Sequence, residues 1–237
     1  MLLQPNHNKF GQYKEKAGLK LLPPQKGLIC DLDMEKIVGT TVYDRTGNGY
    51  NGTLIGDAST SIGIEDLNKS VLKTTTGSGA SIPQPMLPKE AYEFWFYYGA
   101  IHDGYLLRAT SNPRTNIQFY NDGTYPRSIW ISITAPSGNY LNAIYSNNFF
   151  TVGEWHHIIF QWDGSVDADV VQLWKNGKLI LTGTASQQRT VTSSSQTYYF
   201  NDNTGTGEIR TATFRKWDRI LTEKEIKYLY NNGYGIK

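Results

Sequence analysis

Short runs in which apolar and polar residues alternate recur along most of the chain. A period of two is typical of strands that bury one face, and clusters of Gly, Asn, Asp and Pro separate the runs. Strands that recur after about 8–15 residues favour two packed antiparallel sheets, so we predict an all-β sandwich. The expected strands are GLICDLDM, TTVYD, VLKTT, GASIP, AYEFWFYYG, GYLLRAT, TNIQFY, RSIWISIT, YLNAIYS, EWHHIIFQWDG, the hairpin DVVQLWKNGKLILTG, TYYFND and IRTATFRKWD.

Two of these runs are apolar on both faces. AYEFWFYYG (residues 91–99) and EWHHIIFQW (residues 154–162) carry large side chains at successive positions. Such strands are central and covered on both sides. Adjacent strand residues point to opposite faces, so His156 and His157 cannot easily bind one metal ion and are predicted to be structural. The aromatic residues expected to fill the space between the sheets are Phe94, Trp95, Phe96, Trp155, Trp162 and Trp174.

The segment LTEKEIKYLYNNG near the end of the chain predicts one helix. Thr222 is a favourable N-cap, and Glu225 completes a capping box three residues later. Gly233 lies where a C-terminal glycine cap belongs. The apolar stripe that would pack against the sandwich consists of Ile226, Leu229 and Tyr230.

Composition and charge exclude several classes of protein. The net charge of +2 comes without a basic cluster, which argues against nucleic-acid binding. The single cysteine, Cys30, excludes an internal disulfide bond, and we expect it to be a buried apolar side chain. No apolar run is long enough to span a bilayer, so membrane insertion is not expected.

The composition divides the chain into an arm and a domain. Residues 1–26 are polar, lack strand alternation and end near the stiff Pro23-Pro24 pair. We interpret them as an extended N-terminal arm that is disordered alone or docks on a partner. Residues 27–237 form the sandwich domain.

Three acidic residues, Asp31, Asp33 and Glu35, occupy alternate positions and share one face of the first expected strand. Alternate positions lie about 6.5–7 Å apart, within the range of paired carboxylates in glycoside hydrolases. A catalytic acid also needs an apolar wall, whereas Leu32 and Met34 face the other side. We therefore expect Leu32 to pack inward and Asp31 and Asp33 to meet solvent, a cation or backbone amides.

The sequence GNGYNG (residues 47–52) matches a dinucleotide-binding pattern, but no helix follows it. We interpret it as consecutive tight turns.

Four stretches together resemble one known family. They are GTTVYDRTGNGYNGTLIG, AYEFWFYYG, GEWHHIIFQWDGS with the following VQLWKNGKLI, and FRKWDRILTEKEIKYLYNNG. In this order they resemble the laminin-G-like members of the concanavalin A-like lectin/glucanase superfamily. The resemblance covers roughly residues 27–235 and implies a two-sheet antiparallel jelly roll closed by a short C-terminal helix. This fold hosts several functions, so the resemblance alone selects none.

The resemblance also implies a structural calcium ion, which some relatives bind near acidic loops. Oxygen donors suited to it would be Asp33, Asp44 and Asp218.

Binding is favoured over catalysis, so we do not expect an enzyme. Protein–sugar sites combine aromatic ring faces with Asn and Asp groups on loops. The residues expected to bind such a ligand are Tyr105, Tyr120, Asn121, Asp122, Tyr125, Trp130, Asn139 and Tyr140.

These expectations combine into one hypothesis. Residues after Met1 lack a secretory pattern, and lectin-like modules occur in phage particles that cell lysis releases. We therefore expect a non-catalytic virion protein of a bacteriophage that recognises host glycans. Residues 1–26 would contact other virion proteins, and a homo-oligomer would fit that role. The alternatives are a stand-alone carbohydrate-binding module and a glycoside hydrolase or lyase that uses Asp31, Asp33 and Glu35.

Overall fold

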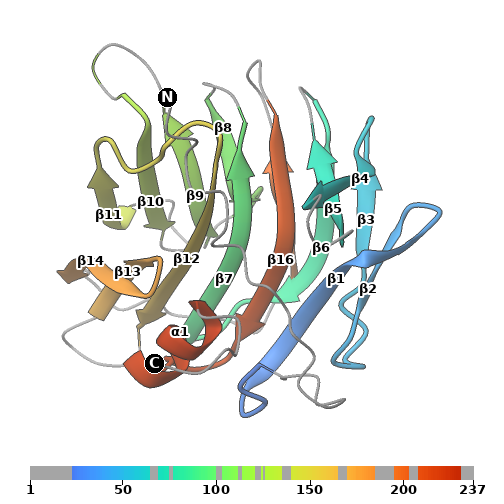
Figure 1. The fold of residues 1–237 in the computed structure, drawn as a ribbon. Helices are drawn as coiled ribbons and strands as arrows, with labels where there is room; N and C mark the ends of the chain where they lie inside the picture. Colours follow the sequence, from blue (N-terminus) through green and yellow to red (C-terminus); the bar gives the residue numbers. More distant parts are fainter. Residues whose placement is uncertain are drawn as a thin grey trace.

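The computed structural model describes residues 23–64, 69–74, 77–99, 103–111, 114–120, 124, 126–134, 140–164, 170–184, 195–202 and 208–230. The described residues form strands and one short helix, in two layers (Figure 1). Hydrogen bonds link the strands in the continuous order β11-β10-β9-β8-β15-β6-β3-β2-β1-β16-β7-β12-β13-β14, and this path folds back on itself. The chain is therefore an all-β antiparallel sandwich, as predicted.

The first layer lies in front in Figure 1 and carries the helix. Strand β7 is its centre, paired with β16 on one side and β12 on the other. Its members are β1 (Leu28–Val38), β4 (Ser59–Ile64), β5 (Lys69–Thr74), β7 (Lys89–Tyr98), β12 (Glu154–Asp163), β13 (Val170–Lys175), β14 (Lys178–Thr184) and β16 (Ile209–Trp217).

The second layer lies behind the first and begins where the path turns from β1 into β2. It packs face to face with the first, as the rings of Phe96 and Phe119 show with centroids 5.4 Å apart. Its members are β2 (Thr41–Asp44), β3 (Gly52–Ile55), β6 (Gly79–Pro85), β8 (Gly104–Ala109), β9 (Arg114–Tyr120), β10 (Ser128–Thr134), β11 (Tyr140–Ser146) and β15 (Ser195–Asp202).

The core between the layers follows the strand alternation. On β7, Phe94 and Phe96 point into the core, and on β12 Ile158, Phe160 and Trp162 do the same. The predicted central position of both segments is confirmed, because their opposite faces are also buried.

The prediction that all six named aromatic residues lie between the sheets was wrong for three of them. Trp95 and Trp174 lie on the outer face of the first layer, where Trp95 stacks on Tyr230 with ring centroids 5.9 Å apart. Trp155 is half-buried beside Tyr97, 5.7 Å away. Successive strand positions face opposite ways, so neighbouring aromatic residues cannot all share one core.

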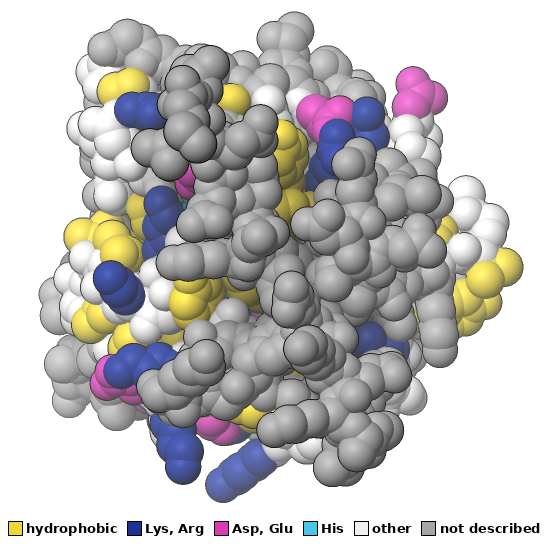
Figure 2. Space-filling model, in the orientation of Figure 1, with side chains coloured by type: hydrophobic (Ala, Val, Ile, Leu, Met, Phe, Trp, Pro, Cys, Tyr) yellow, Lys and Arg dark blue, Asp and Glu magenta, His cyan; other side chains and the backbone are white. Residues whose placement is uncertain are grey.

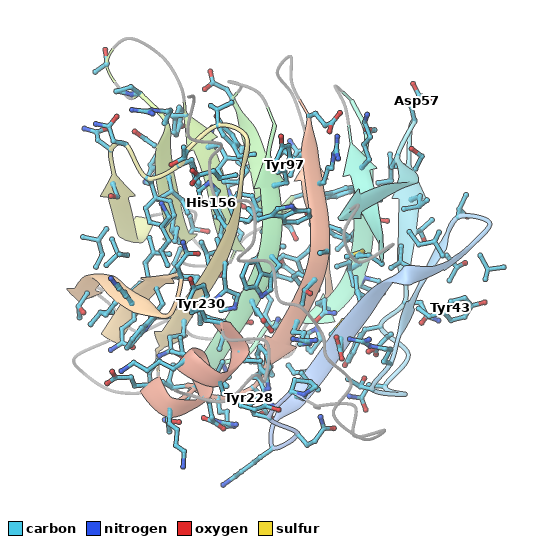
Figure 3. All side chains as sticks on the ribbon, viewed as in Figure 1. Tyr43, Asp57, Tyr97, His156, Tyr228 and Tyr230 are labelled. Atoms are coloured by element: carbon cyan, nitrogen blue, oxygen red, sulfur yellow. The ribbon has the colours of Figure 1, made fainter. Side chains whose placement is uncertain are left out.

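Helix α1 (Glu223–Tyr230) covers this outer face, low in the view of Figure 1. Figure 3 places Tyr230 beside the strands that the helix covers. The predicted capping box is present, because the Thr222 N–H donates to Glu225 and the Glu225 N–H donates to Thr222 Oγ1. The predicted cap at Gly233 lies outside the described residues. Between the helix and the sheet lies a second hydrophobic cluster, separate from the core between the layers. Its members are Ala91, Ile159, Trp174, Trp217, Leu221, Ile226 and Leu229.

The β1–β2 hairpin extends past the body of the sandwich. Val38 is 65% exposed and Tyr43 is 43% exposed, and Figure 3 shows Tyr43 at this projecting edge. Hydrophobic surface is visible at the same edge in Figure 2. After β2, Gly47 and Gly49 have φ angles of 82° and 83°, which supports a tight turn in the first half of GNGYNG. The predicted second turn differs, because Gly52 is the first residue of β3.

The described end of the predicted arm lies against the domain. Trp217 Nε1 donates to the carbonyl of Pro24 at 2.8 Å, and Arg219 Nε donates to that of Lys26 at 2.7 Å. Residues 1–22 lie outside the described residues, so the arm remains a prediction.

Candidate functional site

The outer face of the second layer carries a row of polar and aromatic side chains. Strand register places Tyr105 of β8 opposite Gln118 of β9, and Gln118 opposite Trp130 of β10. Residues opposite each other in antiparallel strands share a face. Ile129 and Ile131, the neighbours of Trp130, are buried in the core, so Trp130 faces outward, as the sequence predicted. We call this face, with the groups described next, the aromatic face.

Two rings form a pair on the aromatic face. Tyr120 follows Gln118 by two residues on β9, and its ring centroid lies 5.7 Å from that of Trp130 with a 35° tilt. Both side chains are half-buried, so each is held by its neighbours and still offers surface to a ligand.

A cation lies among further rings on the same face. The guanidinium of Arg108 lies 5.4 Å from the ring centroid of Tyr105 and 5.8 Å from that of Tyr199. Tyr199 of β15 is opposite Arg108 of β8, and both are half-buried. These distances are those of cation–π contacts, which hold the guanidinium in a defined position.

The aromatic face combines the groups that a polar ring-shaped ligand requires. Flat aromatic surfaces pack against apolar ring faces, and a small number of polar groups fixes the ligand's orientation. Gln118 lies between the two aromatic groups and offers an amide donor and acceptor.

The structure describes only part of the predicted ligand-binding set. Tyr105, Tyr120 and Trp130 lie together on the aromatic face. Tyr140 pairs with Thr134 at the start of β11, but its side chain is outside the description. The predicted residues that lie outside the described residues are Asn121, Asp122, Tyr125 and Asn139.

Sequence reasoning missed Arg108, Gln118 and Tyr199. Each occupies an outward position on its strand, and the residues immediately before and after it are buried. This alternation is visible in the sequence. The meeting of Arg108 with Tyr199, however, depends on the pairing of β8 with β15, which are far apart along the chain.

The side chain of Asp31 contacts cations, which is one of the alternatives that the sequence predicted. It is buried against the guanidinium groups of two arginines. Arg45 Nη2 donates to Asp31 Oδ1 at 2.7 Å, and Arg215 Nε donates to the same atom at 2.9 Å. Leu32 packs inward as predicted. The side chains of Asp33 and Glu35 are outside the description.

The ion pair of Asp31 continues across the outer face of the first layer. Arg215 Nη1 donates to Glu93 Oε2 at 2.9 Å, and His157 Nε2 lies 3.1 Å from Glu93 Oε1. Burial alone would raise the pKa of the Glu93 carboxyl. The charge of Arg215 and the hydrogen bond from His157 outweigh burial, so that pKa lies below its usual value. Asp31, Arg215, Glu93 and His157 thus form a structural network, in which arginine side chains bind the Asp31 carboxylate.

The two histidines point to opposite faces, as predicted. His157 lies beneath α1, with its ring centroid 5.8 Å from that of Tyr230. His156 faces the core beside Phe150, and its Nε2 lies 3.0 Å from the Thr151 carbonyl oxygen. Burial lowers the pKa of His156 to about 4. Both histidines therefore have partners within the fold, which agrees with the prediction that they are structural.

A second buried ion pair lies between the layers. Lys216 Nζ is 3.0 Å from Glu90 Oε1 and donates to the Pro85 carbonyl at 2.6 Å. It also lies 5.1 Å from the ring centroids of Tyr92 and of Tyr198. A lysine with these contacts has a compensated charge and a structural role.

The calcium site implied by the resemblance does not fit the described donors. Asp44 Oδ1 accepts hydrogen bonds from the N–H groups of Asp31 and Thr46, and Asp44 Oδ2 accepts from Tyr50 N–H. The carboxylate is therefore used by the turn. Asp218 is exposed, and the Asp33 side chain is not described. Within the described ranges, no group of three or more His, Cys, Asp or Glu residues could hold a metal ion.

In the part of the chain that the structure describes, no helix is long and apolar enough to cross a membrane.

The chain forms a lectin-like jelly-roll sandwich of two antiparallel layers. Helix α1 covers the outer face of the first layer, and the aromatic face lies on the outside of the second. The chain belongs to the family Laminin_G_3, described as the concanavalin A-like lectin/glucanases superfamily, whose model matches residues 74–227. This confirms the resemblance drawn from the sequence. A comparison with curated proteins by sequence finds no match.

Solved structures with the same fold include receptor-binding domains of botulinum neurotoxins. That of the C/D mosaic serotype has a TM-score of 0.69 and 12% identity, covering 87% of this chain and 51% of its own. The binding domain of neurotoxin DC in complex with SialylT has a TM-score of 0.66 and 14% identity, covering 87% and 52%.

A third structure concerns type C neurotoxin, whose cell entry is described as dependent upon interaction with two ganglioside molecules. Its TM-score is 0.67 at 12% identity, covering 88% of this chain and 52% of its own. This chain thus spans about half the length of these domains, and the likeness shows the fold alone.

Proposed function

We propose that this protein is a non-catalytic glycan-binding module whose site is the aromatic face. The observation that carries the proposal is the register of Tyr105, Gln118 and Trp130 across three neighbouring strands. The Tyr120–Trp130 ring pair adds a second aromatic surface beside Gln118. Rings and an amide that neighbouring strands hold on one face suit a sugar ring, because binding then orders few side chains.

Family membership and the structural neighbours support the same class. The superfamily description names lectins, and two neighbour structures are described with SialylT or with gangliosides. The catalytic alternative has less support, because Asp31, a member of its acidic row, is held by Arg45 and Arg215.

A glycan array probed with the full chain tests this function. Trp130→Ala should abolish binding to every glycan that the wild type retains, because the variant removes the largest ring of the aromatic face. Trp155→Ala is the matched control, since Trp155 is also half-buried but lies on the other layer. Equal binding by wild type and Trp130→Ala, or no binding by the wild type to any glycan, would refute the proposal.

The setting that we propose for this module is the virion of a bacteriophage, with residues 1–26 contacting other virion proteins. A lectin-like domain joined to a polar, proline-ended segment supports this assignment. Mass spectrometry of purified particles should detect the protein in stoichiometric amounts. Glycan binding without particle association would instead support a stand-alone carbohydrate-binding module.

A further inference from the structure

We propose that residues 23–27, which we call the strap, hold helix α1 against the sheet through Trp217 and Arg219. These two side chains lie just before the helix, and each donates a hydrogen bond to a strap carbonyl 193 residues away along the chain. The acceptors are the carbonyls of Pro24 and Lys26. An event that lifts the strap should therefore loosen α1. This coupling goes beyond the proposed glycan binding and does not depend on it.

Arg219 contacts the strap and the helix with one guanidinium group. Its Nε donates to the Lys26 carbonyl at 2.7 Å, and its Nη1 donates to Glu225 Oε2 at 2.9 Å. The same carboxylate oxygen accepts from the Thr222 N–H in the capping box. Because a guanidinium is rigid and planar, a shift of its Nε also shifts the Nη atoms that position Glu225. The first turn of α1 thus depends on the strap.

Trp217 connects the same two segments through an apolar contact. Its fully buried side chain belongs to the second hydrophobic cluster, together with Ile226 and Leu229 of the helix. Its Nε1 donates to the Pro24 carbonyl at 2.8 Å. Leu28, the residue after the strap, packs against this cluster as well. The strap therefore fixes the edge of an indole ring that helps to bury the apolar stripe of the helix.

The strap approaches the chain before the helix most closely at Gly27. The Asp218 N–H donates to the Gly27 carbonyl at 2.9 Å. Gly27 has a φ of 71°, and a Cβ atom there would lie 2.2 Å from Asp218 Oδ1. The exposed Asp218 carboxylate can turn away. Arg219 Cγ and Cδ, at 3.2 and 3.3 Å from such an atom, give way only if the side chain that carries the guanidinium moves.

Hydrogen exchange of the full chain, measured at single amides, tests the coupling. Gly27→Ala changes no side chain of the helix, yet it should speed exchange of the α1 amides about tenfold, because an alanine strained at positive φ favours the lifted strap. The amides of β10, in the other layer, should keep their rates. Gly77→Ala is the matched control, since Gly77 has a φ of 75° and a Cβ atom there meets nothing within 4 Å.

Arg219→Gln tests the route of the coupling. This variant loses the fork that joins the Lys26 carbonyl to Glu225, so it should itself speed exchange in α1. Gly27→Ala should then add much less to Arg219→Gln than it adds to the wild type, because contacts in one network are not additive.

Coupling between two sites is reciprocal, which gives a test that leaves Gly27 unchanged. Thr222→Ala removes the N-cap of α1 and should speed exchange of the Asp218 amide, whose N–H donates to the strap. Thr222→Ser should not.

Unchanged exchange of α1 in Gly27→Ala would overturn the inference. So would an equal rise in Gly77→Ala, a rise shared by β10, or fully additive effects of Gly27→Ala and Arg219→Gln. If Gly27→Ala does not fold, an Asp218 amide that exchanges at the wild-type rate in Thr222→Ala would overturn it. None of these outcomes bears on glycan binding.

Discussion

At the scale of single residues, the charged side chains that the described structure buries as ion pairs each contact a group of opposite charge. Asp31, Arg215 and Glu93 come from three different strands and form a continuous network on the outer face of the first layer. Opposing charges raise the pKa of Arg215 despite its burial. A charge that loses its partner in such a network remains desolvated, and that residual cost exceeds the value of the pair itself.

Replacing Arg215 tests this view. Arg215→Gln leaves the carboxylates of Asp31 and Glu93 buried with less compensation and should reduce the free energy of unfolding by about 3–5 kcal/mol. Urea denaturation at pH 7 would measure the loss. Arg210→Gln is the control, because Arg210 pairs with the partly exposed Glu208 and should cost less than about 1 kcal/mol. A similar small loss in both variants would contradict the structural role.

At the scale of elements, the short helix α1 depends on its start and on the sheet beneath it. The capping box and the ion pair between Arg219 and Glu225 organise its first turn. Leu221, which comes just before the N-cap Thr222, is held by the side-chain amide of Gln161 on β12. This amide donates to the Leu221 carbonyl and accepts from the Leu221 N–H. A helix of this length is marginal alone, so these contacts and its apolar stripe must stabilise it.

Removing the N-cap should therefore weaken the helix. Thr222→Ala should lower the free energy of unfolding by about 1 kcal/mol, because the Glu225 N–H loses its side-chain acceptor. Thr222→Ser retains a hydroxyl and should remain close to the wild type. Thermal denaturation of the three proteins would show the order, and an alanine variant as stable as the serine variant would contradict it.

At the scale of the whole molecule, the two layers enclose one large apolar core that β1 and β2 join at one side. Cys30 on β1 lies in this core with no exposed surface. Burial, with a smaller contribution from the charge of Asp44, raises the pKa of its thiol well above the usual value. A reagent can reach this thiol only when the sandwich opens.

Thiol labelling consequently reports opening of the core. The reaction of Cys30 with an aromatic disulfide reagent in native buffer should be more than about 100-fold slower than in denaturing urea, because β1 is paired on both sides. Cys30→Ser, which contains no thiol, gives the background. Equal rates in the two solvents would contradict a closed core.

The fold was largely predictable because its signals are local. Alternation identified the strands, Asn176-Gly177 marked the β13–β14 hairpin, and Thr222 with Glu225 marked the helix. Part of the candidate site was predictable for the same reason, since Trp130 lies between two inward isoleucines. Which residue supplies the cation beside Asp31 was not predictable, because Arg215 is 184 residues away along the chain.

The sequence by itself determined which residues form strands and which face of each strand is apolar. These properties depend on side chains a few positions apart, and their physical basis is burial of one face. Only the tertiary structure decided which outward side chains meet. Arg108 lies between Tyr105 and Tyr199 because β8 and β15 pair in one register, and that register follows from packing of the whole core rather than from either strand alone.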